Sequence, residues 1–135
     1  RNSIIESHAI AANNTFVYAG AYGSGVFRST DNGDHWQDVS SGLDQPAIWS
    51  LSVIDSVVFL GTNTGLYKST DFGDNWLRVI PQFKSLGIQY TTVVDSTLYV
   101  VVDPGIFTSK DKGLHWDTLL IGKNRSINSI AVTDS

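Results

Sequence analysis

An eight-residue phrase recurs three times at a fixed spacing, and it limits the possible folds more than any other feature of this chain. The copies begin at Ser29, Ser69 and Ser109 and share the pattern Ser-x-Asp-x-Gly-x-x-Trp. Their aspartates stand at positions 31, 71 and 111, so successive copies are 40 residues apart. A period of about 20 to 50 residues is typical of proteins built from stacked copies of one supersecondary unit.

Each period predicts four short strands and no helix. In the middle copy, apolar side chains alternate along residues 48–54, and β-branched and aromatic residues fill 57–60. Two further short runs follow at 66–69 and 77–80, and Asp, Ser, Gly and Asn stand between the runs as turn formers. The other two copies match this pattern column by column.

Four-stranded sheets at this period predict an all-β fold, a β-propeller of antiparallel blades. We expect one partial ring over residues 1–135, with blades at about 3–40, 47–80 and 87–120 and the first strand of a fourth at 126–135. Rings typically hold about four to eight blades. Three blades and one strand therefore predict either a segment of a larger propeller or copies that associate to complete one.

The repeated phrase resembles the Asp-box, also called the bacterial neuraminidase repeat (BNR). The third copy departs from the other two only at variable positions, with Lys110 and Leu114. The resemblance implies a β-propeller in which each box forms the hairpin between the third and fourth strands of a blade. It gives a structural role to Ser29, Asp31, Gly33, Trp36, Ser69, Asp71, Gly73, Trp76, Ser109, Asp111, Gly113 and Trp116.

The chemistry of these residue types agrees with a structural role. An Asp at the start of a turn accepts hydrogen bonds from N–H groups two and three residues on, and Ser adds a second bond of this kind. Gly supplies the positive φ that a tight hairpin needs. We expect each Trp to pack its hairpin onto the blade and so anchor the turn. A calcium loop would need more carboxylates and a terminal Glu, so we expect no metal and no cofactor.

Composition narrows the partners. The net charge is −4, from 9 basic and 13 acidic residues, and this balance does not favour nucleic acid or an anionic membrane. No apolar run approaches the roughly 20 residues that span a bilayer. The chain has no Cys, which excludes disulfides and thiolate chemistry. Similar box-bearing rings occur in secreted bacterial proteins, so the resemblance implies a secreted, cell-surface or periplasmic protein.

One column of the repeat predicts a ligand site. The first strand of a propeller blade lines the central channel, and polar or aromatic residues stand at its mouth in every copy. Such residues, where apolar packing would cost less, are typical of a pocket for a glycan or a peptide. The alternative is a water-filled channel without a ligand. The candidate binding residues are His8, Trp49, Gln89, Tyr90 and Asn128.

Catalysis is not favoured. Sialidases, as the resemblance implies, need an arginine triad and a Tyr–Glu pair, but Arg28 and Arg78 fall on outer strands and Glu6 is the one Glu. Two-carboxylate glycosidases need paired acids, and Asp44 and Asp103 stand in different blades. We expect no catalytic residue in this segment. The sequence favours a non-catalytic scaffold or recognition module that can self-associate. The alternative is part of a sialidase-like or xyloglucanase-like glycoside hydrolase whose catalytic residues lie elsewhere.

Overall fold

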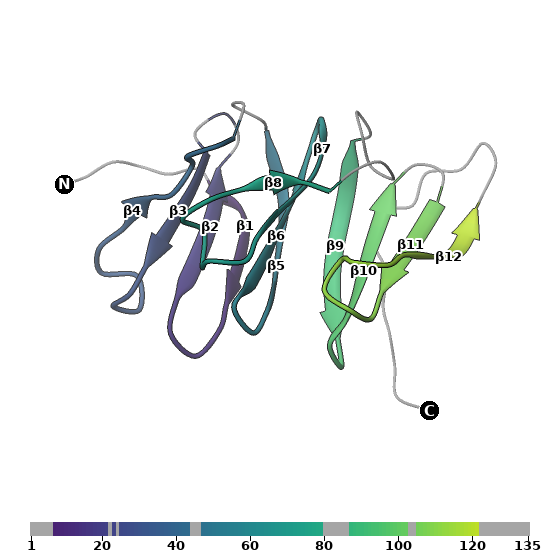
Figure 1. Ribbon diagram of the computed structural model, residues 1–135. Helices are drawn as coiled ribbons and strands as arrows, with labels where there is room; N and C mark the ends of the chain where they lie inside the picture. The colour runs from purple at the N-terminus through teal and green to yellow at the C-terminus, as the bar shows by residue number, and fades with distance from the viewer. Residues whose placement is uncertain are drawn as a thin grey trace.

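Three four-stranded antiparallel sheets make up the described part of the chain (Figure 1). The computed structural model describes residues 7–21, 23, 25–43, 47–79, 87–102 and 105–121. Blade 1 consists of β1 (Ser7–Ala12), β2 (Val17–Ala21), β3 (Gly25–Ser29) and β4 (Gln37–Asp38). Blade 2 consists of β5 (Ile48–Ile54), β6 (Val57–Thr62), β7 (Gly65–Ser69) and β8 (Leu77–Arg78). Blade 3 consists of β9 (Ile88–Val94), β10 (Thr97–Val102), β11 (Gly105–Ser109) and β12 (Asp117–Ile121).

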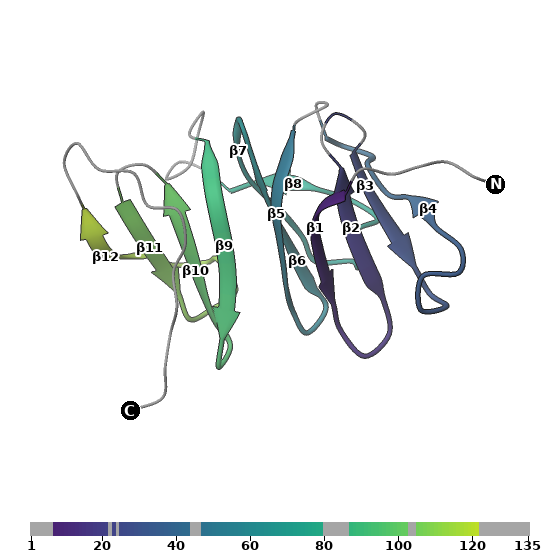
Figure 2. The same cartoon turned by 180° about the vertical axis from the view of Figure 1, so that it is seen from behind.

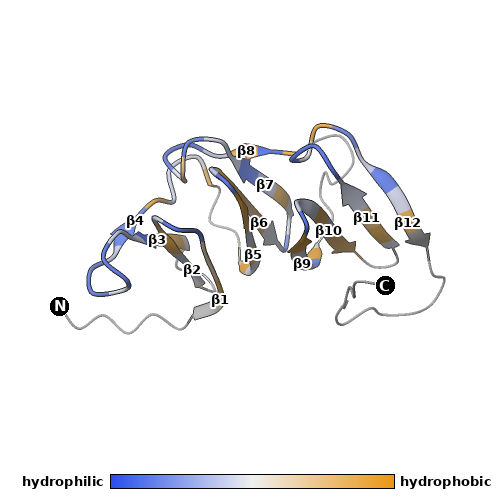
Figure 3. Cartoon of the chain, turned by 90° about the horizontal axis from the view of Figure 1, so that it is seen from below, coloured by the Kyte–Doolittle hydropathy of each residue, from blue (hydrophilic) through white to orange (hydrophobic). Residues whose placement is uncertain are grey.

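The blades stand side by side (Figures 1 and 2) and curve around one concave side (Figure 3). Successive strands pair in chain order within each blade. The first strands, β1, β5 and β9, lie along the concave side, and the last strands, β4, β8 and β12, lie on the outer side (Figure 3). The apolar colour in Figure 3 concentrates in the strands, whereas the box hairpins on the outside are polar.

Two apolar cores hold the blades together, one in each seam between neighbours. Tyr18, Leu60 and Trp76 belong to the core between blades 1 and 2. Phe59 and Val100 belong to the core between blades 2 and 3. Strand β6 supplies both cores from opposite faces, and all six of its residues are buried. Burial of both faces explains why the second-strand segment reads as a continuous apolar run.

Glycine lets the first strand of one blade approach the second strand of the blade before it. A Cβ at Gly61 would lie 2.7 Å from Ile88 Cγ2, and a Cβ at Gly20 would overlap Ile48 Cγ2. Neither glycine has a positive φ, so space, not backbone conformation, requires Gly at these two positions.

The predicted all-β class and four strands per period are confirmed in the described residues. The fourth strand of blade 2 is shorter than predicted: β8 ends at Arg78, although Val79 N still donates to Leu66 O at 2.8 Å. The predicted strand at 126–135 lies outside the described residues. Within the described ranges, no helix has the length and apolar character needed to cross a membrane.

Candidate functional site

All three boxes form the same hydrogen-bonded turn. In the first, Ser29 Oγ accepts the N–H of Gly33 at 2.8 Å and donates to Asp31 Oδ1 at 2.8 Å. Asp31 Oδ1 also accepts the N–H of His35 at 2.8 Å. The second and third boxes repeat these bonds from Ser69 and Asp71 and from Ser109 and Asp111.

The roles of Ser and Asp in this turn differ from the prediction. The Asp carboxylate accepts an N–H four residues on, because the Ser hydroxyl already takes the closer N–H groups of Asp31 and Gly33. The predicted positive φ is confirmed at Gly33, with a value of 96°. The residue before it is also left-handed, with φ of 61° at Asn32, and the same holds at Phe72 and Lys112. Two consecutive left-handed residues turn the chain sharply, and the Ser and Asp side chains hold that conformation.

The box aspartates are committed to their own turns. The backbone N–H of His35 lowers the pKa of Asp31 to about 2, and the same bond from His115 does so for Asp111. The side-chain amide of Asn75 has this effect on Asp71. Asp31 in turn raises the pKa of His35 through a hydrogen bond of 2.6 Å to Nδ1. The described residues contain no cluster of three or more acidic or His side chains able to hold a metal.

Two of the three box tryptophans, Trp76 and Trp116, contact the neighbouring blade. Trp76 of blade 2 is 5% exposed, and its indole N–H donates to the Val39 carbonyl of blade 1 at 2.7 Å. Trp116 packs against the core between blades 2 and 3. Trp36 is 37% exposed, because no other described blade lies against its face of blade 1. Each indole also lies close to the glycine of its own box, and Trp116 Nε1 donates to the Gly113 carbonyl at 3.0 Å. The box Trp thus serves its own hairpin, as predicted, and the contact across the seam is an addition that the sequence did not predict.

Polar side chains connect the blades at the same turns. Tyr18 Oη and Arg28 Nη1 of blade 1 donate to the Phe72 carbonyl at 2.8 Å and 3.0 Å. Lys68 Nζ of blade 2 makes the equivalent bond to the Lys112 carbonyl at 3.0 Å. Burial raises the pKa of Tyr18 to about 12, so this phenol stays a donor. The boxes are joints of the scaffold, and their Ser and Asp side chains are already engaged in their own turns.

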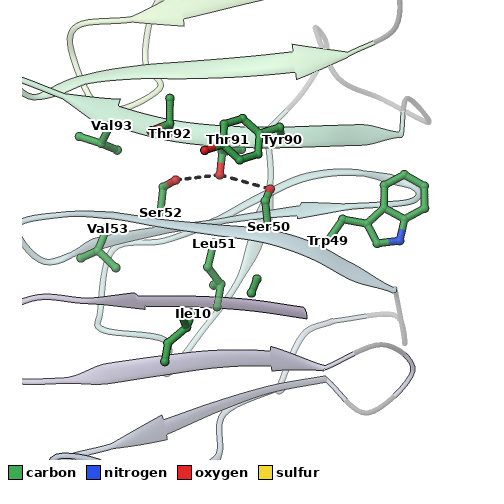
Figure 4. A pocket seen from close by; sticks show the side chains of 11 residues that line it. Ile10, Trp49, Ser50, Leu51, Ser52, Val53, Tyr90, Thr91, Thr92 and Val93 are labelled. Atoms are coloured by element: carbon green, nitrogen blue, oxygen red, sulfur yellow. Dashed lines mark hydrogen bonds between the residues drawn. The ribbon is translucent and has the colours of Figure 1, made fainter. Parts of the chain in front are cut away.

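A groove runs along the concave side between β5 and β9, with β1 at its edge. We call it the channel groove. Its volume is about 410 Å³, and Figure 4 shows its walls. Its lining residues are Ala9, Ile10, Trp49, Ser50, Leu51, Ser52, Val53, Tyr90, Thr91, Thr92 and Val93. None of them is acidic or basic.

A row of hydroxyl groups crosses the floor of the channel groove (Figure 4). Thr91 Oγ1 lies 2.7 Å from Ser52 Oγ and donates to Ser50 Oγ at 3.2 Å. All three side chains are buried. Because Thr91 has a single proton and gives it to Ser50, Ser52 donates to Thr91. Ser50 is thus the last hydroxyl of the row, and it follows Trp49 in the sequence.

Trp49 lies at one end of the channel groove, and one side of its indole packs against the backbone. Its side chain is 40% exposed. A Cβ at position 87 would lie 3.5 Å from Trp49 Cζ3, so the indole packs over Gly87, in the connection between blades 2 and 3. This contact fixes one side of the ring while much of the side chain stays open to solvent.

The structure brings two predicted binding residues, Trp49 and Tyr90, into one groove. Gln89 is half-buried on β9 and does not line the groove. His8 lies on β1, but its side chain is outside the described set, as is Asn128. Sequence reasoning missed Ser52, Thr91 and Thr92. A signal existed: Ser50 and Ser52 stand at the positions that hold Ala9 and Ala11 in blade 1.

The charged residues weighed for catalysis do not gather at the groove. Arg28 donates to the Phe72 carbonyl and forms an ion pair with Asp74. Arg78, on the outer strand β8, donates to the Thr64 carbonyl. Glu6, Asp44 and Asp103 lie outside the described residues.

Comparisons with known proteins agree on the fold. The family model described as "DUF6242 beta propeller domain" matches residues 2–127. No curated protein matches the sequence. An ancestral GH74 enzyme superposes with a TM-score of 0.74 at 22% identity, over 85% of this chain and 18% of that one.

Two other solved structures have the same architecture. YCF48 bound to D1 peptide gives a TM-score of 0.66 at 15% identity, over 85% of this chain and 41% of that one. The extracellular domain of a candidate one-component system, BT4673, from B. thetaiotaomicron gives 0.78 at 14% identity, over 98% and 19%. The chain thus spans less than half of each neighbour, and these likenesses show the fold alone.

Proposed function

The chain belongs to the DUF6242 beta propeller domain family, and we propose that this segment is a non-catalytic recognition module with its ligand site in the channel groove. The supporting observation is the pairing of Trp49 with Tyr90 in one groove whose described lining residues include no acidic or basic side chain. Apolar walls with a few placed polar groups are the usual make-up of a small-ligand site.

This lining favours an uncharged ligand, either a glycan or a peptide segment. The open side of the Trp49 indole suits the apolar face of a sugar ring or a proline ring. The hydroxyls of Ser50, Ser52 and Thr91 supply polar groups in the same groove. YCF48 has been solved with a bound peptide, and one neighbour is a GH74 enzyme, so both ligand classes occur with this architecture.

The described groove supports binding better than hydrolysis. Glycoside hydrolysis in most families needs two carboxyl groups on either side of the scissile bond, and no carboxyl group lines this groove. The alternative function is a glycoside hydrolase in which this segment supplies scaffold and substrate contacts. The GH74 neighbour favours it, and it requires catalytic acids on other blades.

The proposal also includes additional blades that cover the exposed face of blade 1. Ile10 is 69% exposed at the edge of the channel groove. Because Ala9 and Ala11 pack on the core between blades 1 and 2, Ile10 points to the opposite face of blade 1. Trp36 is exposed on that face too, where a neighbouring blade would bury both side chains. We include self-association of copies through such faces in the proposal. Export to the cell surface or beyond fits the extracellular neighbour BT4673.

The experiment compares three proteins on a glycan array and in peptide pull-downs: the parent chain, Trp49→Ala and Trp36→Ala. The two tryptophans are almost equally exposed, at 40% and 37%, so Trp36→Ala controls for the loss of any surface indole. We expect Trp49→Ala to lose binding and Trp36→Ala to keep it. Binding that survives Trp49→Ala would remove the groove from the assignment. Turnover of a xyloglucan or sialoside probe by the parent would favour the hydrolase alternative.

A further inference from the structure

Two strongly exposed leucines line a second groove on the outer side of the molecule. We call it the rim groove, about 290 Å³ in volume, formed by Lys68, Leu77, Arg78, Val79, Gly113 and Leu114. Leu77 is 74% exposed on β8, and Leu114 is 70% exposed in the box of blade 3. They come from different repeats, and only the fold brings them to one groove.

The other seam of the same chain provides an internal comparison. Leu77 pairs with Lys68 as Gln37 pairs with Arg28 in blade 1, and Leu114 takes the box position of Asp74. In the first seam, Arg28 ties these two polar residues together, at 3.3 Å to Gln37 Oε1 and 3.0 Å to Asp74 Oδ1. Both polar partners are leucine in the second seam.

The fold therefore does not demand leucine at either position. The first seam forms with Gln37 and Asp74 at the equivalent positions, and neither Leu77 nor Leu114 is buried. Exposed aliphatic side chains that share one groove are typical of an interaction site.

The rim groove is locally positive on a chain of net charge −4. Lys68 and Arg78 line it, and they donate to the backbone carbonyls of Lys112 and Thr64, while Arg78 also lies over the Tyr67 ring. Within the described residues, neither forms an ion pair with a carboxylate. Lys110 and Lys112 flank it in the third box, and Asp55 pairs with Lys112 at 3.1 Å. None of the described residues that line the groove carries a carboxylate.

The neighbouring strand favours a peptide as the occupant. Among the described strands, β8 is the outermost of blade 2 and pairs with β7 only. Its outer backbone edge is therefore available to an extended segment, a common mode of peptide recognition.

We propose that the rim groove docks an acidic peptide segment carrying a bulky aliphatic residue. The aliphatic side chain packs between Leu77 and Leu114, and flanking carboxylates approach Arg78 and Lys68. This surface lies on the outer side of the blades, away from the channel groove, so the inference does not depend on the proposed function.

The test is an NMR titration of the ¹⁵N-labelled full chain with a capped peptide of sequence Asp-Glu-Leu-Glu-Leu-Asp. We expect saturable amide shifts centred on residues 77–78 and 113–114, which weaken as salt increases. A matched peptide with serine for both leucines, and another with lysine for every acid, should bind at least about tenfold more weakly, as expected for loss of a buried aliphatic group or of charge attraction.

The protein variants come from the repeat itself. Leu77→Gln and Leu114→Asp install the residues that the first seam already carries, so the fold tolerates them, and each should weaken binding by about tenfold. Leu119→Gln, at a 58% exposed leucine of β12 outside the groove, is the matched control and should bind as the parent does. The absence of saturable shifts, equal binding of the serine or lysine peptide, or equal loss with Leu119→Gln would overturn the proposal.

Discussion

Trp76 should be among the most costly side chains to truncate, because it closes the seam between blades 1 and 2. It is 5% exposed and donates its indole N–H to the Val39 carbonyl at 2.7 Å. Trp→Ala changes in cores cost about 3–5 kcal/mol of unfolding free energy. Trp36 occupies the same box position but is 37% exposed, so we expect Trp36→Ala to cost about 1 kcal/mol or less.

A second substitution separates the hydrogen bond from the packing. Trp76→Phe keeps an aromatic ring in the seam but leaves the Val39 carbonyl without its indole donor. An unsatisfied buried acceptor costs about 1–3 kcal/mol. The expected order of unfolding free energies is therefore parent, Trp36→Ala, Trp76→Phe and Trp76→Ala, from most to least stable.

The assay is urea unfolding followed by far-ultraviolet circular dichroism, with the slope m checked in every variant, because a changed slope would signal altered cooperativity. Equal losses for Trp36→Ala and Trp76→Ala would refute the reasoning. They would mean that the box Trp stabilises its own hairpin and not the seam between blades.

Three further predictions concern packing, pH and assembly. Gly61→Ala should lower the unfolding free energy by about 1–3 kcal/mol in urea titrations, since its Cβ would lie 2.7 Å from Ile88 Cγ2; an unchanged midpoint would contradict the close approach. The box aspartates have pKa values of about 2, below the ordinary 3.8, so their stabilisation is present above pH 4 and is lost as the pH falls from 4 toward 2. The raised pKa of His35 acts in the opposite direction: its stabilisation is complete below pH 6.5 and is lost as the pH rises through the folded pKa. His35→Asn, which copies Asn75 of the second box, should therefore flatten the melting temperature above pH 6.5, and an unchanged slope there would argue against the His35–Asp31 pair. Exposed Ile10 and Trp36 predict association of the chain, so light scattering should give a mass above 14.7 kDa that falls toward it in Ile10→Asp; a parent that is monomeric at moderate concentration would reject this.

Sequence reasoning succeeded where the determinant lies within one repeat. The alternating run at residues 48–54 is strand β5 at the predicted bounds. The box glycines have the positive φ that the turn requires. Both depend on contacts or backbone preferences within a few residues, which a single sequence displays directly.

Features that depend on the seam between repeats were missed or misread. The Trp76 indole N–H donates to the Val39 carbonyl, 37 residues away in the sequence. The residues of its own box give no indication of that acceptor. The hydroxyl row joins Ser50 and Ser52 of blade 2 to Thr91 of blade 3. Trp49 and Tyr90 were chosen because their column is polar, but the groove that they share becomes visible only once β5 and β9 lie side by side.

The most direct test of the proposed ligand site follows the tryptophan indole N–H signals of the ¹⁵N-labelled chain, which contains 4 Trp, while a ligand found on the array is added. Trp49 lines the channel groove, whereas Trp36 and Trp76 lie in box hairpins. We predict that the Trp49 signal shifts saturably and that the Trp36 and Trp76 signals remain in place. A ligand that binds saturably without moving the Trp49 signal would contradict the account.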